Sequence, residues 1–386
     1  MSSYLDNYEI NDLLGSGAYA QVYKCTRKSD QQNFAIKILK TLDKHNNSTF
    51  RTFDNELSIN NKLNKTINKE EENNKNVSRV SHDNIVNLHD YYQKPTYCLI
   101  FDLCKGGDLF DDIEKREHYY ERDAAVAMQQ ILSGVAYINK NKIIHCDLKP
   151  ENLLLTETGL VKIADFGMAV DVSHYPNEEI KGQRGTEIYM APEVFNKSFS
   201  YKADAWSCGV IMYILFAGFF PFNDIDDDHM KAKFDFNDVV FSDMSNAAKK
   251  LIGKLIVRKP KKRLLCSEAL KDKWFNILKL SDNNGKNNNG KDDNNSLNIS
   301  NPSLSSAQLK IKEFNTNRRF KRAALTVMAA KRFTGTNSCI NEASPERKVL
   351  SSDVSTLRGQ EREPGFSEPP SPTGCISWLS MLFGRR

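Results

Sequence analysis

The spacing of apolar residues changes along this chain, and that change limits which folds it can adopt. Between residues 8 and 40, and again over 97–103, apolar residues alternate with polar ones or form short runs, which is typical of β-strands. From about Asp123 onward they recur at helical intervals, as in AAVAMQQILSGVAYI and ADAWSCGVIMYILF. A β-rich beginning followed by a longer α-rich body predicts an α+β fold with two lobes. We place the small lobe at about 8–103 and the larger, helical lobe at about 104–275.

One helix is expected inside the small lobe, and three segments of different character follow the body. Residues 50–63 carry apolar side chains at helical spacing, and the Asn-rich stretch 64–80 predicts a loop insertion. Residues 281–303 are rich in Asn and cannot bury a core, so we expect a linker there. A basic segment at 304–333 and a Ser/Pro/Gly-rich tail at 334–386, which we expect to be disordered, complete the chain.

The composition is that of an ordinary soluble protein, with 40% hydrophobic and 27% charged residues among 386. A net charge of +5 is too small to indicate a nucleic-acid-binding protein. None of the apolar runs approaches the roughly 18 residues that a membrane span needs. The eight Cys residues include no Cys-x-x-Cys pair and none with His at zinc-ligand spacing. We therefore expect reduced thiols in a cytoplasmic protein.

The stretch GSGAYAQV, residues 15–22, has Gly at its first and third positions and Ala20 where the pattern G-x-G-x-x-G has its third Gly. Glycines let backbone N–H groups approach phosphates closely, although a Gly-containing hairpin that binds nothing is the alternative. Further along, FAIK places Lys37 at the end of an apolar strand, where a buried ammonium needs an anionic partner. Glu56, in the helix expected at 50–63, is the candidate partner. A lysine that extends from the strand edge to solvent is the alternative.

The stretch IIHCDLKPENLLL carries Asp147, Lys149 and Asn152 on one short loop framed by apolar runs. DFG follows at 165–167 and APE at 191–193. A Gly-rich loop, a strand Lys, H-x-D-L-x-x-x-N, DFG and APE, in this order, form the signature of protein kinases. Because coincidence explains five ordered motifs poorly, we conclude that residues 8–275 resemble the protein kinases.

This resemblance implies phosphoryl transfer from ATP with Mg²⁺, and it implies a role for each motif. Asp147 would accept or orient the proton of the substrate hydroxyl, Lys149 would reach the transferred phosphate, and Thr186 would brace both. Asn152 and Asp165 would hold Mg²⁺, an ion that prefers hard oxygen ligands. The Lys at position 149 resembles that of serine/threonine kinases rather than tyrosine kinases. The ATP-binding residues that the resemblance implies are Leu14, Gly15, Gly17, Val22, Ala35, Lys37, Glu56, Phe101, Asp102, Cys104 and Asp165.

Two further residues resemble architectural positions of the same family. Asp204 resembles the helix aspartate that supports the catalytic loop. Arg263 resembles the arginine that pairs with the glutamate of APE, here Glu193. We expect both residues to hold the site in place without taking part in the reaction.

Two stretches, YCLIFDLCKGGDLFDDI and KEFNTNRRFKRAALTVMAAKRF, resemble the calcium/calmodulin-dependent protein kinases, type II above all. The first implies that Phe101 is the gatekeeper beside the adenine and that residues 102–104 face the base. It also puts Asp108 where the family has an acidic residue that reads a basic side chain upstream of the phosphosite, with Glu151 assisting. Carboxylates suit an Arg guanidinium, so we expect protein substrates with Arg about three positions before the Ser or Thr.

The segment from Lys310 to Phe333 contains eight Lys or Arg residues against one Glu. A basic amphipathic helix is typical of a calmodulin target or of a membrane-surface segment. Phe320, Val327 and Phe333 have the one–eight–fourteen spacing of calmodulin anchors. The resemblance implies that this segment blocks the substrate cleft until Ca²⁺-loaded calmodulin removes it. A helix that simply packs on the kinase body is the alternative.

Cys146 stands where most kinases have an Arg that binds a phosphate on the activation loop. A thiol cannot provide that charge, so we expect that phosphorylation of this loop is not the main switch. The autophosphorylated Thr of the type II enzymes aligns with Ala307, and too few residues follow Phe333 for their association domain. We therefore expect a monomer whose activity does not persist without calmodulin.

Other interpretations stay open. The calcium-dependent kinases of plants and protists carry EF-hands, whereas DNNGKNNNGKDD, from Asp282, lacks both the Gly and the final Glu of such a loop. A kinase of that type without EF-hands would not respond to calmodulin. A pseudokinase scaffold is the third reading, although no catalytic group is missing. The final residues, GCISWLSMLFGRR, could contact a lipid surface with Cys375 acylated, but we favour a disordered tail.

Overall fold

The computed structural model describes residues 7–17, 20–40, 47–64, 82–93, 97–116, 119–196, 198–222, 225 and 227–279. The predicted linker, basic segment and tail, at 281–303, 304–333 and 334–386, lie outside the described residues. The strands are β1 (Tyr8–Ser16), β2 (Ala20–Arg27), β3 (Asn33–Leu39), β4 (Leu88–Tyr92), β5 (Cys98–Asp102), β6 (Ile143–Ile144), β7 (Leu153–Leu155), β8 (Val161–Ile163), β9 (Val170–Asp171), β10 (Ile180–Lys181) and β11 (Ser198–Phe199). The α-helices are α1 (Asn47–Leu63), α2 (Leu109–Arg116), α3 (Glu121–Lys140), α4 (Pro192–Phe195), α5 (Lys202–Ala217), α6 (Asp227–Lys231), α7 (Asn246–Leu255) and α8 (Cys266–Ala269).

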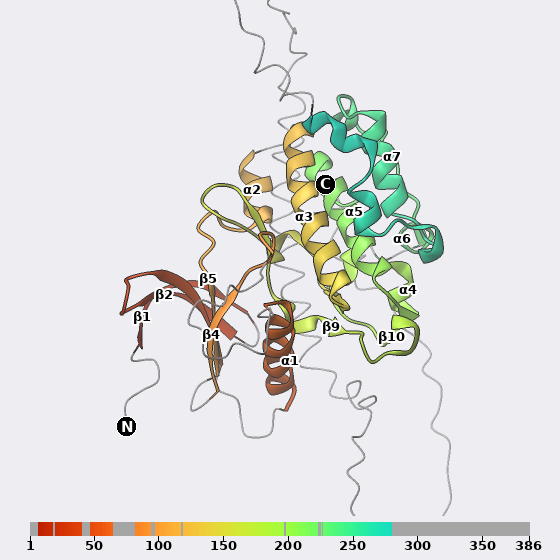
Figure 1. Ribbon diagram of the computed structural model, residues 1–386. Coiled ribbons are helices and arrows are strands. Elements are labelled where there is room, and N and C mark those ends of the chain that lie inside the picture. Colours follow the sequence, from red (N-terminus) through yellow and green to blue (C-terminus); the bar gives the residue numbers. More distant parts are fainter. Residues whose placement is uncertain are drawn as a thin grey trace, which may run out of the picture. The chain divides into compact units, whose positions relative to one another are not determined.

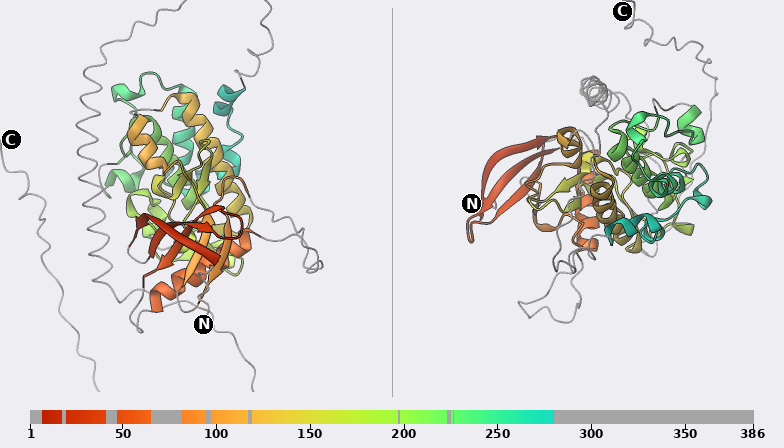
Figure 2. Two further views of the ribbon diagram at one scale, coloured as in Figure 1. Left: turned by 90° about the vertical axis from the view of Figure 1, so that its left-hand side faces the viewer. Right: turned by 90° about the horizontal axis from the view of Figure 1, so that it is seen from above.

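The first lobe is a five-stranded antiparallel sheet with the strand order β1-β2-β3-β5-β4. Successive side chains of a strand point to opposite faces, which the apolar clusters reflect. Phe34, Ile36 and Ile100 pack together on one face. Leu99 and Phe101 lie on the other face, in a cluster to which helix α1 contributes. Figure 1 shows α1 beside the sheet, and Figure 2 shows the sheet to one side of the helices.

The second lobe is built around α3 and α5, which run side by side through its middle (Figure 1). Helix α3 has the apolar spacing of three and four residues expected of a helix with one covered face, as at Met128, Ile131, Leu132 and Val135, all fully buried. Helix α5 is buried all round, from Ala203 to Ala217, which explains its nearly continuous apolar sequence. The two helices therefore form the centre of the apolar core of this lobe.

The predicted α+β fold with two lobes is confirmed. The short strands β6 to β11 of the second lobe were not predicted, because two or three residues are too few to show a strand period. The longer strands and helices agree with the spacing of apolar residues in the sequence, because that spacing follows from the burial of one face of each element. None of the helices in the described residues combines the length and apolar content required to cross a membrane.

Candidate active site

A buried carboxylate of helix α5 holds the loop between β6 and β7 in place. The Asp204 side chain, only 1% exposed, accepts hydrogen bonds from the backbone N–H of His145 at 2.9 Å and of Cys146 at 3.1 Å. Burial raises the pKa of Asp204, although the nearby His145 and these N–H donors act in the opposite direction. Cys146 has φ of 68°, in the left-handed region. The support for the loop that the sequence predicted for Asp204 is present.

Asp147, Lys149 and Thr186 lie in mutual contact at the centre of the site. Oδ1 of Asp147 accepts hydrogen bonds from the hydroxyl of Thr186 at 2.7 Å and from its backbone N–H at 2.8 Å. Nζ of Lys149 lies 2.9 Å from Oδ2 of Asp147 and donates to Oγ1 of Thr186 at 2.9 Å. Burial disfavours the ammonium of Lys149, but the Asp147 carboxylate outweighs it, so the pKa of Lys149 is raised. One carboxylate is thus fixed on two sides while a cation stands beside it.

Thr186 reaches Asp147 because the residue before it has no side chain. Gly185 has φ of 105°, and a Cβ atom there would lie 2.1 Å from the carbonyl oxygen of Cys146. The two segments therefore meet backbone to backbone.

Lys37, Glu56 and Asp165 join three separate elements: strand β3, helix α1 and the DFG turn. Nζ of Lys37 lies 2.8 Å from Oε2 of Glu56 and 2.9 Å from Oδ1 of Asp165. The charge of Lys37 holds the pKa of Asp165 at about 2, although burial works against it. The two carboxylates raise the pKa of Lys37 against the largest single influence, its own burial. The expected pairing of Lys37 with Glu56 is present.

Asn152 and Asp165 both present oxygen donors of the kind that Mg²⁺ prefers. Nδ2 of Asn152 donates to the carbonyl of Asp147 at 2.8 Å and approaches its Oδ2 at 3.3 Å, so the amide oxygen points away from these contacts. The Asp165 carboxylate is ionised at neutral pH because its pKa is about 2. An amide oxygen and an ionised carboxylate are hard donors, so these two residues fit Mg²⁺.

The side chain of Asp102, at the end of β5, points away from Lys37. Phe34 pairs with Asp102 and Ala35 with Phe101, so Asp102 lies on the sheet face opposite that of Phe101 and Lys37. We predicted that residue 102 faces the adenine. Its side chain lies on the other face of the sheet, so a nucleotide contact of Asp102 would use its backbone, and that contact stays a prediction.

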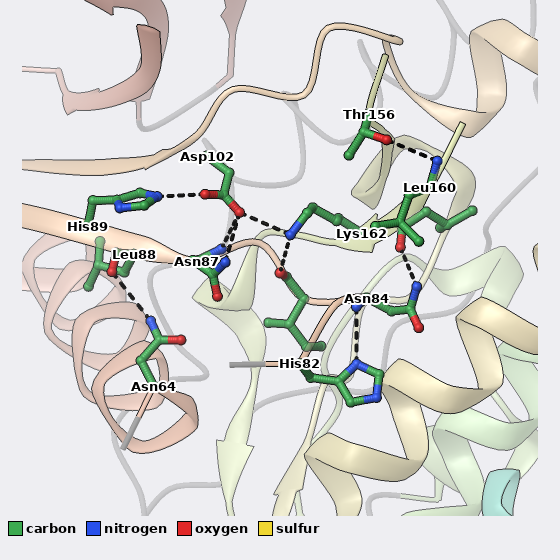
Figure 3. A network of polar contacts seen from close by, with 12 residues as sticks. Asn64, His82, Asn84, Asn87, Leu88, His89, Asp102, Thr156, Leu160 and Lys162 are labelled. Atoms are coloured by element: carbon green, nitrogen blue, oxygen red, sulfur yellow. Dashed lines mark hydrogen bonds and ion pairs between the residues drawn. The ribbon is translucent and has the colours of Figure 1, made fainter. Parts of the chain in front are cut away.

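Figure 3 shows what the Asp102 carboxylate contacts instead. Oδ1 lies 2.6 Å from Nε2 of His89, and Oδ2 accepts from Nδ2 of Asn87 at 3.0 Å and from Nζ of Lys162 at 3.1 Å. Burial works against the charged form of Asp102, yet the His89 and Lys162 contacts prevail and lower the pKa to about 2. Lys162 belongs to β8, so this network joins the sheet to the second lobe. The sequence motifs gave no sign of it.

Cys104 is half-buried beyond this network, and burial, followed by the charge of Asp102, raises the pKa of its thiol to about 11. A hollow of about 420 Å³ opens on this side of the chain, lined in part by Phe34, His89 and Cys104. It contains none of the catalytic-loop residues. The placement of Cys104 at the nucleotide stays a prediction.

The remaining predicted nucleotide residues lie on β1 to β3 and β5. Val22 pairs with Lys37 and Ala35 with Phe101, and these four side chains share one face of the sheet. Three of the predicted nucleotide residues lie on β1 or in the turn after it: Leu14, Gly15 and Gly17. The side chain of Leu14 is 51% exposed. The sheet thus brings the predicted ATP residues of three strands onto the face that carries Lys37.

Comparison with known proteins agrees with this geometry. The family model for the protein kinase domain matches residues 8–275. The chain is 34% identical to rat calcium/calmodulin-dependent protein kinase type IV (Rattus norvegicus), over 92% of this chain and 69% of that protein. The chain belongs to the calcium/calmodulin-dependent family of serine/threonine protein kinases.

Two other relatives show the breadth of the likeness. The kinase is 33% identical to the type II calcium/calmodulin-dependent enzyme of Caenorhabditis elegans, over 99% of this chain and 49% of the relative. It is 32% identical to calcium-dependent protein kinase 4 of Plasmodium berghei, over 84% of this chain and 58% of the relative. This kinase therefore spans about half the length of several relatives that it matches.

The predicted substrate residues lie near the start of helix α2 and in the catalytic loop of the kinase. Oδ1 of Asp108 accepts a hydrogen bond from the backbone N–H of Asp111 at 2.8 Å, so Asp108 caps helix α2. Glu151 lies in the 3₁₀ turn Pro150–Asn152, between Lys149 and Asn152. The structure therefore assigns Asp108 a structural task that the sequence had not indicated, and its contact with substrate stays a prediction.

Arg263 and Glu193 form the expected pair under the activation segment. Nη1 of Arg263 lies 2.5 Å from Oε1 of Glu193, and Nη2 lies 3.0 Å from Oε2. The Arg263 side chain has no exposed surface and also donates to two backbone carbonyls, those of Lys202 and Val257. This bidentate pair anchors the end of the activation segment to the second lobe. The calmodulin anchors Phe320, Val327 and Phe333 lie outside the described residues.

Asn55 and Lys62 of helix α1 are site residues that the sequence motifs missed. Asn55 contacts the backbone just after Asp165, and Lys62 contacts Asp171. Neither residue belongs to a kinase motif. No spacing within the helix indicates them, because the residues that they contact lie more than a hundred positions further along the chain.

Proposed function

We propose that this kinase transfers the γ-phosphate of ATP to Ser or Thr residues of proteins that carry a basic residue upstream. The observation that carries the proposal is the contact of Asp147 with both Lys149 and Thr186, beside the Lys37–Glu56 pair. A complete and ion-paired set of this kind favours an active enzyme over a scaffold, since phosphoryl transfer depends on positioning and charge.

Asp147 would receive the proton of the substrate hydroxyl. Its Oδ1 is occupied by both donors of Thr186, so the carboxylate cannot rotate freely and is oriented before substrate arrives. As the hydroxyl oxygen bonds to the γ-phosphorus, the bond from that phosphorus to the β–γ bridging oxygen breaks and ADP leaves. The hydroxyl proton passes to Asp147. The ammonium of Lys149, 2.9 Å from Oδ2, would stabilise negative charge on the transferred group.

Lys37 would hold the α- and β-phosphates of ATP, with Glu56 fixing the direction of its side chain. When bound to Asn152 and Asp165, Mg²⁺ supplies charge neutralisation at the phosphates. On the substrate side, the carboxylates of Asp108 and Glu151 would recognise the upstream Arg.

Regulation by Ca²⁺-loaded calmodulin is part of the proposal. The names of the type II and type IV relatives support it, as does the excess of eight basic residues over one acidic residue from Lys310 to Phe333. The segment would block protein substrates until calmodulin binds Phe320, Val327 and Phe333. We also propose a cytoplasmic monomer. The buried thiols of Cys208 and Cys266, which form no disulfide although the Cys266 thiol donates to the Cys208 sulfur at 3.9 Å, suit a reducing compartment.

The test is phosphorylation of an Arg-x-x-Ser peptide by the full chain with ATP and Mg²⁺. It is run with EGTA, with Ca²⁺ alone, and with Ca²⁺ plus calmodulin. We expect phosphate transfer only in the last mixture, and none from the Lys37→Met variant. A chain with Phe320, Val327 and Phe333 all changed to Asp should lose the response to calmodulin.

Two results would favour other functions. Equal transfer in all three mixtures would leave a protein kinase that calmodulin does not control, of the calcium-dependent type without EF-hands. No transfer in any mixture, with calmodulin still bound, would instead indicate a scaffold that recruits calmodulin.

A further inference from the structure

Two polar side chains of helix α1 in the small lobe lie on a different face from Glu56. Asn55 and Lys62 are seven residues apart, close to two helical turns, so they share one face, whereas Glu56 lies about 100° further round the helix. Glu56 binds Lys37, the contact on which ATP binding depends in the proposed function. The other two residues contact the activation segment, on either side of that ion pair.

The side-chain amide of Asn55 donates hydrogen bonds to the backbone that follows the DFG turn. Its Nδ2 donates to the carbonyl of Ala169 at 2.9 Å and approaches that of Gly167 at 3.2 Å. These carbonyls lie two and four residues after Asp165, which is itself 2.9 Å from Lys37. The amide of Asn55 therefore ties the helix to the same turn that positions Asp165.

Lys62 makes a second attachment about two turns further along the helix. Its Nζ lies 2.6 Å from Oδ1 of Asp171 and donates to Oγ of Ser173 at 2.7 Å. The Ser173 hydroxyl in turn donates to the same oxygen of Asp171 at 2.6 Å. With 19% and 33% of their side chains exposed, Lys62 and Asp171 are partly shielded from solvent. Charge-assisted contacts in such surroundings are stronger than those of a fully exposed pair.

The same helix is also seated on the second lobe by apolar contacts. Ile59 and Leu63 belong to the core cluster of that lobe, and the Tyr137 hydroxyl donates to the carbonyl of Leu63 at 2.9 Å. Apolar packing fixes how closely the helix approaches but constrains its rotation and sliding only weakly, because it is not directional. The directional contacts of Asn55 and Lys62 supply that constraint.

Unmodified side chains make all these contacts. In this chain Cys146 replaces the Arg that would bind an activation-loop phosphate, and burial raises the pKa of its thiol. A neutral thiol cannot draw a phosphorylated segment into place. Another device must hold the helix and the activation segment together.

We propose that Asn55, Lys62, Asp171 and Ser173 form an α1 latch, a set of positioning residues that keeps Glu56 on Lys37 without phosphorylation of the activation segment. The proposal rests on the proposed kinase activity and adds to it how the ATP-binding pair is held. If the latch opened, helix α1 could move, and a smaller fraction of the molecules would have Glu56 on Lys37. The apparent affinity for ATP would fall in proportion to that fraction.

The first measurement does not depend on activity. Amide hydrogen exchange of the full chain is compared for wild type, Lys62→Met and Asp171→Asn, without ATP. We expect both variants to raise the exchange rates of residues 55–63 about tenfold, and Lys62→Arg to leave them near wild type. A double variant with the charges exchanged, Lys62→Asp with Asp171→Lys, should restore part of the protection.

Steady-state kinetics with Ca²⁺ and calmodulin give the second measurement. We expect Lys62→Met to raise KM for ATP about tenfold while KM for the peptide stays unchanged, because only the nucleotide depends on Lys37. Lys142→Ala is the matched control. It removes the ion pair of Lys142 with Glu178, which reaches the same activation segment from the second lobe rather than from α1.

The outcomes separate the latch from the kinase activity. The latch would be overturned if residues 55–63 exchanged at the wild-type rate in both Lys62→Met and Asp171→Asn. It would also be overturned if Lys142→Ala raised KM for ATP as much as Lys62→Met does. If Lys62→Met does not fold, Asp171→Asn and Lys62→Arg decide alone. A wild-type chain without transfer activity would refute the proposed function, whereas the exchange rates would still test the latch.

Discussion

The ammonium of Lys149 lies 2.9 Å from Oδ2 of Asp147, and the opposite oxygen of that carboxylate is held by Thr186. The pair therefore offers a fixed acceptor and a cation side by side. A hydroxyl and a phosphate group that meet at this point would find both charges already in place.

Asp147→Asn should lower kcat by about 10²–10⁴-fold, because the amide oxygen can still accept from Thr186 but the group no longer accepts a proton. KM for ATP should change little, since Lys37 is intact. Steady-state kinetics with Ca²⁺, calmodulin and a saturating peptide measure both constants. A decrease of less than tenfold would remove Asp147 from proton transfer.

Arg263→Met should destabilise the folded state by about 3–5 kcal/mol, because Glu193, 12% exposed, would keep its charge without a partner. Urea unfolding of the full chain measures the difference. The double variant with Glu193→Met as well should recover much of the loss, since it leaves no lone charge. A single variant as stable as wild type would show that the pair is not structural.

Asp108 allows its capping role to be separated from substrate recognition. Asp108→Asn keeps a cap acceptor for the N–H of Asp111 but loses the charge, so kcat/KM for an Arg-x-x-Ser peptide should fall about tenfold with stability unchanged. Asp108→Ala should show the same kinetic loss and lose about 1 kcal/mol of unfolding free energy besides. A peptide without the Arg serves as control. Equal losses on both peptides would mean that Asp108 does not read the Arg.

The Asp102 network should make stability depend on pH. The pKa of Asp102 is about 2 in the folded chain, below the value of about 3.9 for an unfolded Asp. Between pH of about 2 and about 4 the folded state therefore binds fewer protons than the unfolded state. The stability that the ionised Asp102 contributes is full above pH of about 4 and is lost as the pH falls toward 2.

Asp102→Asn should accordingly cost about 2 kcal/mol of unfolding free energy at pH 5 to 7. The gap to wild type should narrow as the pH is lowered below about 4. Urea unfolding across this range measures it, with the exposed Asp243→Asn as the control that should show no gap. If the difference in unfolding free energy between wild type and Asp102→Asn stayed constant down to the lowest pH, the ionised Asp102 would not be the source of that difference.

The order of elements and the catalytic loop could be predicted because both follow from short-range patterns. The periods of two and 3.6 residues reflect burial on one face, and the motifs around Lys37 and Asp147 are continuous in sequence. The sequence could not predict on which face of the sheet the Asp102 side chain lies, because a motif names a residue without giving its face. The pairing of Phe34 with Asp102 fixes that face.

The contacts of Lys162 and Lys62 could not have been predicted in the same way. Lys162 meets Asp102 across 60 residues and Lys62 meets Asp171 across a still longer separation, so no local spacing indicates either pair. Only the register of the sheet and the seating of helix α1 bring them together. Such pairs are a property of the folded chain rather than of any one segment.

The close approach of Gly185 to Cys146 has a consequence for how natural variation in this chain should be interpreted. A Cβ atom at position 185 would meet the carbonyl oxygen of Cys146 at 2.1 Å, so no other residue fits there without a shift of the backbone. A survey of sequence variants would thus find inherited change refused at a residue that bears no chemical group and never takes part in the reaction.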